Sequence, residues 1–115
     1  MSEDIYDRLA RCEGFDWDDG NAPKVKTRHG IEPGECQQAC FSDPFVVVAD
    51  PKHSEREERW WALGSTLGGR HLYLVLTIRR SVLIRVIAAR DMNRKERKLY
   101  GQVKARAEEN PDVPV

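Results

Sequence analysis

The chain has 115 residues, a length typical of one domain, and 40% of them are hydrophobic, which is enough for one modest core. Basic and acidic residues balance, so the net charge of zero does not by itself predict a nucleic-acid partner. No apolar stretch is long enough to cross a membrane, and the acidic first residues lack the apolar segment of a secretory signal, so we expect a cytoplasmic protein without membrane association.

Short elements are expected before the first long strand. Residues 3–13 carry apolar side chains at helical spacing and could form a short helix. Residues 15–18 alternate between apolar and acidic side chains, as a short strand does. Pro23 suits the first turn of a helix that ends near Gly30, and a second short helix is expected at about residues 34–41.

Four further strands are expected at residues 45–48, 59–63, 72–78 and 82–89. The last two are the most apolar and are separated by a very short connection, so they should form a central hairpin. A final helix should begin after Asn93, which can form a capping box with Glu96. This order predicts an α+β fold in which a four-stranded antiparallel meander has its helices packed on one face.

One domain is expected at residues 14–107, between an N-terminal extension at 1–13 and a flexible tail at 108–115. Charge is distributed unevenly along this chain. Acidic residues dominate residues 1–20, and basic residues dominate residues 79–106. The basic third could attract a polyanion although the average charge is neutral.

The cysteines Cys12, Cys36 and Cys40 are an odd number and show no C-x-x-C spacing, which favours reduced thiols over a disulfide framework. Cys36 and Cys40 could share one helical face. A zinc ion needs two further ligands, and nothing in the sequence brings His29, His53 or Cys12 close to that pair. We therefore expect no metal site.

The register of the central hairpin decides which face of the sheet is open. An odd number of connecting residues places the two aliphatic faces together, with Thr77 opposite Arg85 and Arg79 opposite Leu83. An even number would bury the charge of Arg85, which is costly, so we predict the odd connection. With Arg90 just beyond the strand, three permanently charged guanidiniums could converge on one phosphate. The alternative is that each arginine pairs with a neighbouring acid.

Several blocks in this sequence resemble the BrnT family of toxins. They begin with Phe-Asp-Trp-Asp at 15–18, end with Glu96 and Tyr100, and between these lie 28–31, 43–44, 50–54, 57–59, Gly64, 69–70, 77–79 and 85–90. The shared order and spacing make the resemblance specific. It implies a fold similar to RelE-type ribonucleases.

The resemblance also implies the toxin of a type II toxin–antitoxin system, an endoribonuclease that cleaves RNA without a metal ion or other cofactor and inhibits growth. A cognate BrnA-like antitoxin would neutralise it and help to bind operator DNA. The sequence departs from the family pattern at Asn21, where a lysine is usual, at Val25, where an asparagine is usual, and at Ala88, where a serine is common. These departures keep open a non-catalytic module that binds RNA or the antitoxin. A further alternative is a structural protein whose basic face docks an acidic helix of an antitoxin-like partner.

RNA cleavage by the 2′-hydroxyl needs a base, an acid and positive charge at the phosphate. The candidate catalytic residues are Arg79, Arg85, Arg90, His29 and Tyr100. The candidates for RNA binding are Lys24, Arg28, Tyr73 and Thr77. In this hypothesis the arginines stabilise the phosphate, His29 is the acid or base, and Tyr100 orients the phosphate or donates a proton. The structural alternatives are that His29 caps a helix end, that Tyr100 packs in the core and that His53 is simply solvated.

Overall fold

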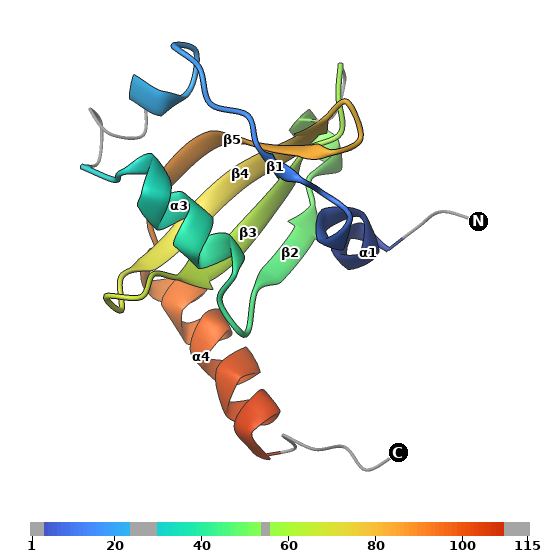
Figure 1. The fold of residues 1–115 in the computed structure, drawn as a ribbon. Helices are drawn as coiled ribbons and strands as arrows, with labels where there is room; N and C mark the ends of the chain where they lie inside the picture. The colour runs from blue at the N-terminus through green and yellow to red at the C-terminus, as the bar shows by residue number, and fades with distance from the viewer. Residues whose placement is uncertain (1–3, 24–29, 54–55, 110–115) are drawn as a thin grey trace.

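The chain folds around one mixed sheet of five strands in the computed structural model, which describes residues 4–23, 30–53 and 56–109. The strands are β1 (Gly14–Phe15), β2 (Val46–Ala49), β3 (Trp60–Ser65), β4 (His71–Arg79) and β5 (Leu83–Asp91), in the spatial order β1-β5-β4-β3-β2 (Figure 1). The strands β2 to β5 form the expected antiparallel meander.

The edge strand β1 corrects the predicted four-stranded antiparallel sheet. It pairs in parallel with β5, with Gly14 opposite Leu83 and Phe15 opposite Ile84. The alternating pattern at residues 15–18 indicates a strand, but its partner lies far along the chain, and no local pattern reveals such a pairing. The sheet is therefore five-stranded and mixed.

The β4–β5 hairpin has the predicted register. Thr77 lies opposite Arg85 and Arg79 lies opposite Leu83, so the prediction of an odd connection is confirmed. The turn is made possible by Arg80 and Ser81, which adopt positive φ angles of 53° and 63°. This left-handed backbone is uncommon outside glycine and closes the hairpin tightly.

A β-bulge interrupts the same hairpin at Ile87. Leu76 pairs with Val86 but Val75 pairs with Ala88, which leaves Ile87 as an extra residue in β5. A regular ladder would turn the side chain of Arg90 toward the buried face, because side chains alternate along a strand. The bulge instead places Arg90 opposite Tyr73, on the same face as Arg79 and Arg85.

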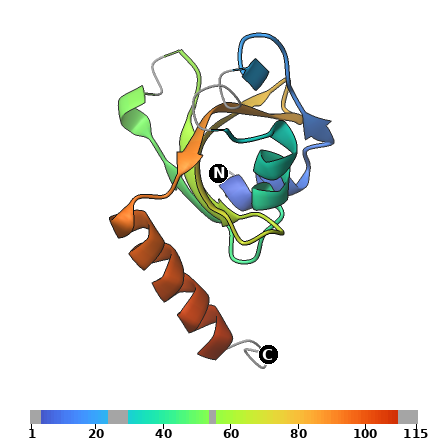
Figure 2. The same cartoon turned by 90° about the vertical axis from the view of Figure 1, so that its left-hand side faces the viewer.

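Helices cover the two faces of the sheet unequally. Helices α1 (Ile5–Ala10) and α3 (Pro33–Cys40) pack on the face that buries Leu72, Leu74 and Leu76, and the sheet curves around them (Figure 2). At Gly64 of β3, an added Cβ would overlap the carbonyl oxygen of Ala39, so glycine permits the close approach of α3.

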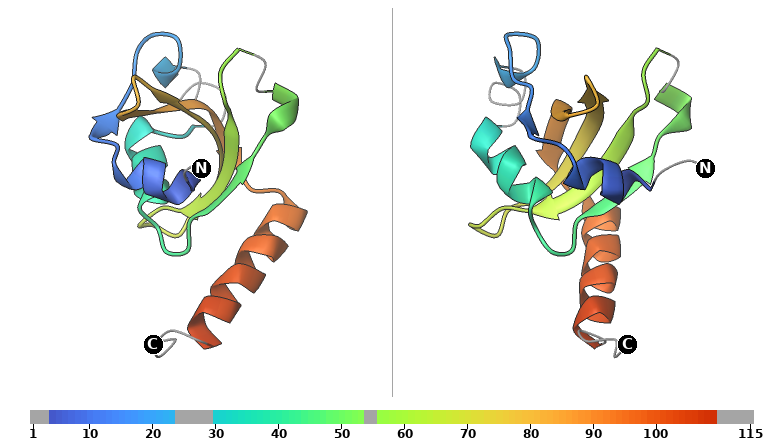
Figure 3. Two further views of the ribbon diagram at one scale, coloured as in Figure 1. Left: turned by 90° about the vertical axis from the view of Figure 1, so that its right-hand side faces the viewer. Right: turned by 45° about the vertical axis from the view of Figure 1, so that its right-hand side comes forward.

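Helix α4 (Arg94–Glu109) corrects the expectation that all helices pack on one face. Tyr100, with Met92 just before the helix, covers Leu63 on the opposite face, beside Trp61 and Tyr73. The helix follows β5 almost directly and covers the apolar end of this outer face, while its later turns extend away from the sheet (Figure 3). In the described part of the chain, no helix is long and apolar enough to cross a membrane.

Candidate functional site

The outer face of the β4–β5 hairpin is the candidate site because it carries the predicted arginines. Arg79, Arg85 and Arg90 all lie on this face. Each guanidinium is paired with its own acidic residues. Arg79 pairs with Glu57, Arg85 pairs with Asp16 and Asp18, and Arg90 pairs with Glu96. The alternative that each arginine pairs with a neighbouring acid therefore describes this arrangement, and any anionic ligand must compete with carboxylates.

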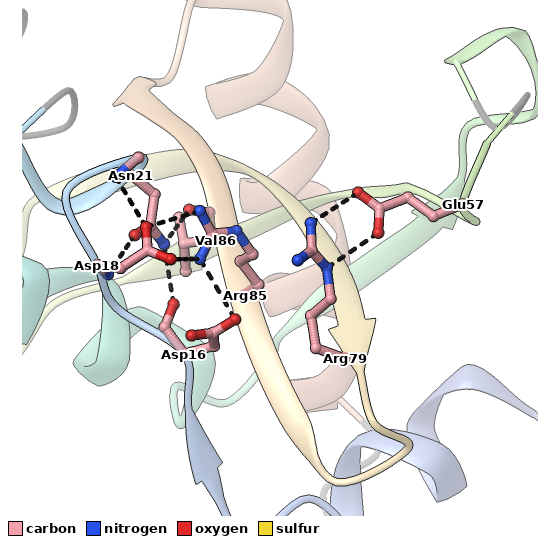
Figure 4. A network of polar contacts seen from close by, with 8 residues as sticks. Asp16, Asp18, Asn21, Glu57, Arg79, Arg85 and Val86 are labelled. Atoms are coloured by element: carbon pink, nitrogen blue, oxygen red, sulfur yellow. Dashed lines mark hydrogen bonds and ion pairs between the residues drawn. The ribbon is translucent and has the colours of Figure 1, made fainter.

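Arg85 is the most enclosed of the three, with 12% of its side chain exposed. It donates to both carboxylate oxygens of Asp18, at 3.1 and 2.9 Å, and lies 3.3 Å from a carboxylate oxygen of Asp16 (Figure 4). These acids are in place because the chain leaves β1 alongside β5, where the backbone N–H of Asp16 donates to the carbonyl oxygen of Ile84 at 2.8 Å. The planar fork of arginine fits a carboxylate and a phosphate alike, so this position could bind either.

Asn21 fastens the acidic segment to the sheet. Its side chain is 1% exposed, accepts from the backbone N–H of Asp18 at 2.8 Å, and donates to the carbonyl oxygens of Asp16 and Val86, both at 2.9 Å. The amide thus satisfies a carbonyl of β5 beyond the end of the short β1 strand. Asn21 stands where the family pattern usually has a lysine. In this structure its side chain holds the segment whose acids, Asp16 and Asp18, bind Arg85.

Arg79 and Arg85 share an electrostatic environment. The hydrogen bonds from Arg85, followed by the one from the backbone N–H of Gly20, hold the pKa of Asp18 below its ordinary value, and the charge of Arg79 acts in the same direction. The hydrogen bonds to Asp18 raise the pKa of Arg85 in turn. Arg85 is therefore the main cation at the Asp18 carboxylate, and Arg79 adds the smallest contribution.

Arg79 is more accessible, with 44% of its side chain exposed. It forms a two-point pair with Glu57, with Nε–Oε2 and Nη2–Oε1 distances of 3.0 and 3.2 Å (Figure 4). Glu57 belongs to the connection between β2 and β3. The next residue of that connection, Glu58, is anchored because the hydroxyl of Thr77 donates to its carbonyl oxygen at 2.8 Å.

Arg90 joins the sheet to α4. It donates to both carboxylate oxygens of Glu96, at 2.7 and 2.8 Å, and its guanidinium carbon lies 3.9 Å from the centre of the Tyr73 ring. The other aromatic contact of Tyr73 is a stacked one with Trp61. Glu96 also accepts from the backbone N–H of Asn93, as the predicted capping box requires. These contacts give Arg90 and Tyr73 a structural role at the start of α4.

Two other predicted residues are buried, and three lie outside the described residues. Thr77 is 1% exposed and Tyr100 is 2% exposed, and the hydroxyl of Tyr100 donates to the carbonyl oxygen of Pro44 at 2.7 Å. The residues outside the described ranges are Lys24, Arg28 and His29. Of the predicted site residues, the structure therefore leaves Arg79 and Arg85 on the outer face of the hairpin, with Arg79 accessible and Arg85 largely enclosed by its acidic partners.

A cleft of about 470 Å³ lies in the connection between β2 and β3, a segment that the sequence indicates only as a polar loop. Its lining residues are predominantly basic: Lys52, His53, Arg56, Glu57 and Arg59. The segment includes a short helical turn, η1 (Pro51–His53), which places His53 Nδ1 3.0 Å from a carboxylate oxygen of Asp50. A histidine three residues after an aspartate, in a run of charged residues, is the sequence signal for this cleft.

A metal site is not assembled by the described residues, among which no group of three or more potential ligands occurs. Cys36 and Cys40 lie on α3, and burial raises the pKa of both thiols to about 12. They are therefore protonated at neutral pH and fill space in the core as small apolar groups.

Comparison with known proteins agrees with the fold and the sequence blocks. A family model described as the ribonuclease toxin BrnT of type II toxin–antitoxin systems matches residues 17–96, a range that contains Asp18, Asn21, Arg79 and Arg85. The crystal structure of the Brucella abortus ribonuclease toxin BrnT is similar in fold, with a TM-score of 0.51 and 16% sequence identity, over 70% of this chain and 97% of that one. No curated protein matches the chain.

Proposed function

This chain belongs to the BrnT family of ribonuclease toxins of type II toxin–antitoxin systems, and we propose that it cleaves RNA without a divalent metal ion. The observation that carries the proposal is the placement of Arg79 and Arg85 on the same outer face of the β4–β5 hairpin, on neighbouring strands, where each holds an anionic group through two hydrogen bonds. The proposal assigns this activity to residues 14–107.

The proposed reaction uses the RNA itself as the nucleophile. The 2′-oxygen attacks the adjacent phosphorus, a new O2′–P bond forms, the P–O5′ bond breaks, and the products are a 2′,3′-cyclic phosphate and a free 5′-hydroxyl. Negative charge accumulates on the phosphate in the transition state, and preorganised cations at that position accelerate the reaction. Arg85 and Arg79 supply this charge, and both remain protonated at cellular pH.

In this proposal, an RNA phosphate displaces the carboxylates from the arginines. A phosphate has the same planar pairing geometry toward a guanidinium as a carboxylate, so it can replace Glu57 on Arg79 and Asp18 on Arg85. Arg79 would exchange first because more of its side chain is exposed. Asp16 and Asn21 would continue to hold the surroundings of Arg85.

The remaining predicted residues enter the proposal unequally. His29 is retained as an acid or base, and Lys24 and Arg28 as contacts to flanking phosphates, on the grounds of sequence alone. Thr77 and Tyr100 are left out because their side chains are buried. Arg90 and Tyr73 are left out because their contacts hold α4 on the sheet.

The partner proposed for this toxin is a BrnA-like antitoxin that neutralises it and, in complex with it, binds operator DNA. This follows from membership of a family named for toxin–antitoxin systems. Expression of the chain alone should arrest bacterial growth, and co-expression of the antitoxin encoded beside it should restore growth. Growth arrest that persists with the antitoxin would contradict the assignment of that partner.

The direct test is an RNA cleavage assay with the purified protein in excess EDTA. An RNA should be cut to products with a 2′,3′-cyclic phosphate, whereas the same RNA with 2′-deoxyribose at the cleaved position should remain intact. Loss of cleavage in EDTA with recovery in Mg²⁺ would contradict the metal-independent mechanism. Absence of cleavage under both conditions would contradict the ribonuclease proposal.

The alternative is a non-catalytic module that binds RNA or the antitoxin. The pairing of Arg79, Arg85 and Arg90 with carboxylates favours the antitoxin-binding form of this module, because none of the three offers an empty anion site for RNA. The same assay separates the two functions: a binding module would retain RNA in a filter-binding experiment and leave it uncut.

A further inference from the structure

The cleft between β2 and β3 has the composition of a site that accepts a polyanion. Four of its five lining residues are basic or can become positively charged, and the fifth, Glu57, is already paired with Arg79. The base of the connection is closed by the backbone, because the N–H of Asp50 donates to the carbonyl oxygen of Arg59 at 2.9 Å. This hydrogen bond brings Asp50 and Arg59, on the two sides of the connection, close to one another.

His53 is a residue of the cleft whose imidazole is oriented by a carboxylate, that of Asp50. Its Nδ1 lies 3.0 Å from a carboxylate oxygen of Asp50, whose side chain is 19% exposed, whereas the side chain of His53 is 65% exposed. A carboxylate at Nδ1 favours the tautomer that carries its proton there, which leaves the lone pair of Nε2 available. This is the state that a general base requires.

Glu57 connects the cleft to the arginine face. It lines the cleft and at the same time pairs with Arg79 at 3.0 and 3.2 Å. A phosphate that took the place of the Glu57 carboxylate on Arg79 would therefore lie at the wall of the cleft that holds His53. One strand of RNA could contact the arginine face and the cleft together.

We propose that His53, oriented by Asp50, is a catalytic residue of this chain and accepts the proton of the attacking 2′-hydroxyl. The inference rests on the proposed ribonuclease function and assigns the role of base to His53 in place of His29. The 2′-hydroxyl proton moves to Nε2 of His53 as the O2′–P bond forms, and the 5′-oxygen takes a proton from solvent water as the P–O5′ bond breaks. Asp50 is a positioning residue, because it acts through His53.

The test compares the pH dependence of kcat/KM for the wild type and His53→Asn in EDTA. Among the described residues, Asp50 contacts the imidazole, and the charged groups that line the cleft with it are Lys52, Arg56, Glu57 and Arg59. Cleavage by His53→Asn should fall by about 10²- to 10⁴-fold, the usual contribution of a general base, and should lack the rise in rate with pH that a general base gives the wild type on the acidic side. Asp50→Asn should reduce the rate less and should keep that rise.

The matched control is His71→Asn, which changes an exposed histidine at the start of β4 outside the cleft and should leave the rate and the pH profile unchanged. Binding of RNA with 2′-deoxyribose at the cleavage position should stay within about twofold in His53→Asn. A wild type that cleaves RNA and a His53→Asn variant with an equal rate and profile would overturn the inference and leave the ribonuclease function intact. A loss of binding parallel to the loss of rate would also overturn it, and a wild type that cuts no RNA would overturn both proposals.

Discussion

Arg85 and Arg79 lie on neighbouring strands of one hairpin, but their surroundings differ. Arg85 is largely enclosed by Asp16 and Asp18, which a buried asparagine in turn fastens to β5. Arg79 has one acidic partner, Glu57, and nearly half of its side chain is exposed. The two arginines therefore suit different tasks. Arg85 is held by many contacts and suits precise charge stabilisation, whereas Arg79 is exposed enough to capture a ligand.

Arg85→Ala should produce the largest effect. It removes a fixed cation from the proposed transition-state site, so cleavage should fall by about 10²- to 10³-fold, as on removal of one preorganised donor from an active site. It also leaves Asp16 and Asp18 without this partner, so the melting temperature should fall. The measurement combines cleavage rates with thermal unfolding. The variant Arg85→Lys keeps the charge but loses the planar fork, so its rate should lie between those of the wild type and Arg85→Ala. Full activity in Arg85→Ala would remove Arg85 from the site.

Asn21→Ala tests whether the enclosure of Arg85 is structural. The variant leaves the carbonyl oxygens of Asp16 and Val86 without their donor, and loss of a buried hydrogen-bond partner costs about 1–3 kcal/mol. Denaturant unfolding should report this loss, and cleavage should fall through misplacement of Arg85. The neighbouring exposed variant Asp19→Ala should change stability by less than about 0.5 kcal/mol. Equal stability of the two variants would show that Asn21 fastens nothing.

Arg79→Ala should reduce cleavage by about tenfold with little change in stability. Its pair with Glu57 is exposed, and such pairs contribute about 0–1 kcal/mol, whereas a tenfold change in rate needs only about 1.4 kcal/mol at the transition state. Arg94→Ala, at the exposed start of α4, is the matched control and should cleave RNA normally. A drop in melting temperature as large as that of Arg85→Ala would erase the contrast between the two arginines.

The smallest effect concerns acid stability. The pKa of Asp18 is held below its ordinary value of 3.8, mainly by hydrogen bonds from Arg85, so its ionised form stabilises the fold above that pH and this contribution disappears as the pH falls through the lowered value. Asp18→Asn should therefore unfold at a slightly lower temperature than the wild type at pH 7. The two melting curves should converge as the pH falls below about 4. A gap that widened in acid would contradict this sign.

The sequence was sufficient for features governed by alternation between neighbouring residues. The facing of Thr77 and Arg85 follows from the period of a strand and from the cost of burying a charge, and both are local. The parallel pairing of β1 with β5 could not be foreseen, because it joins Phe15 to Ile84 across most of the chain. The carboxylate partners of Arg79 and Arg85 lie 22 and 67 residues away in sequence, so only the fold shows which acids they are.

The candidate site shows the same limit. The accessibility of Arg79 and the burial of Thr77 differ although both residues lie on one face of β4, because the β2–β3 connection covers Thr77 through Glu58. That coverage depends on tertiary packing. The sequence indicates that His53 is solvated, and its side chain is indeed 65% exposed, but the basic residues that line a cleft with it come from both sides of the β2–β3 connection and are brought there by the fold.

The extra residue at Ile87 changes the phase of β5 partway along its length. Before it, odd-numbered residues face outward, and after it, even-numbered residues do so. Deletion of Ile87 would invert the facing of the residues that follow it in β5. Arg90 would then turn toward the aliphatic face and lose its hydrogen bonds to Glu96, and α4 would leave the sheet in another direction. One inserted residue thereby sets the orientation of the whole C-terminal helix relative to the arginine face.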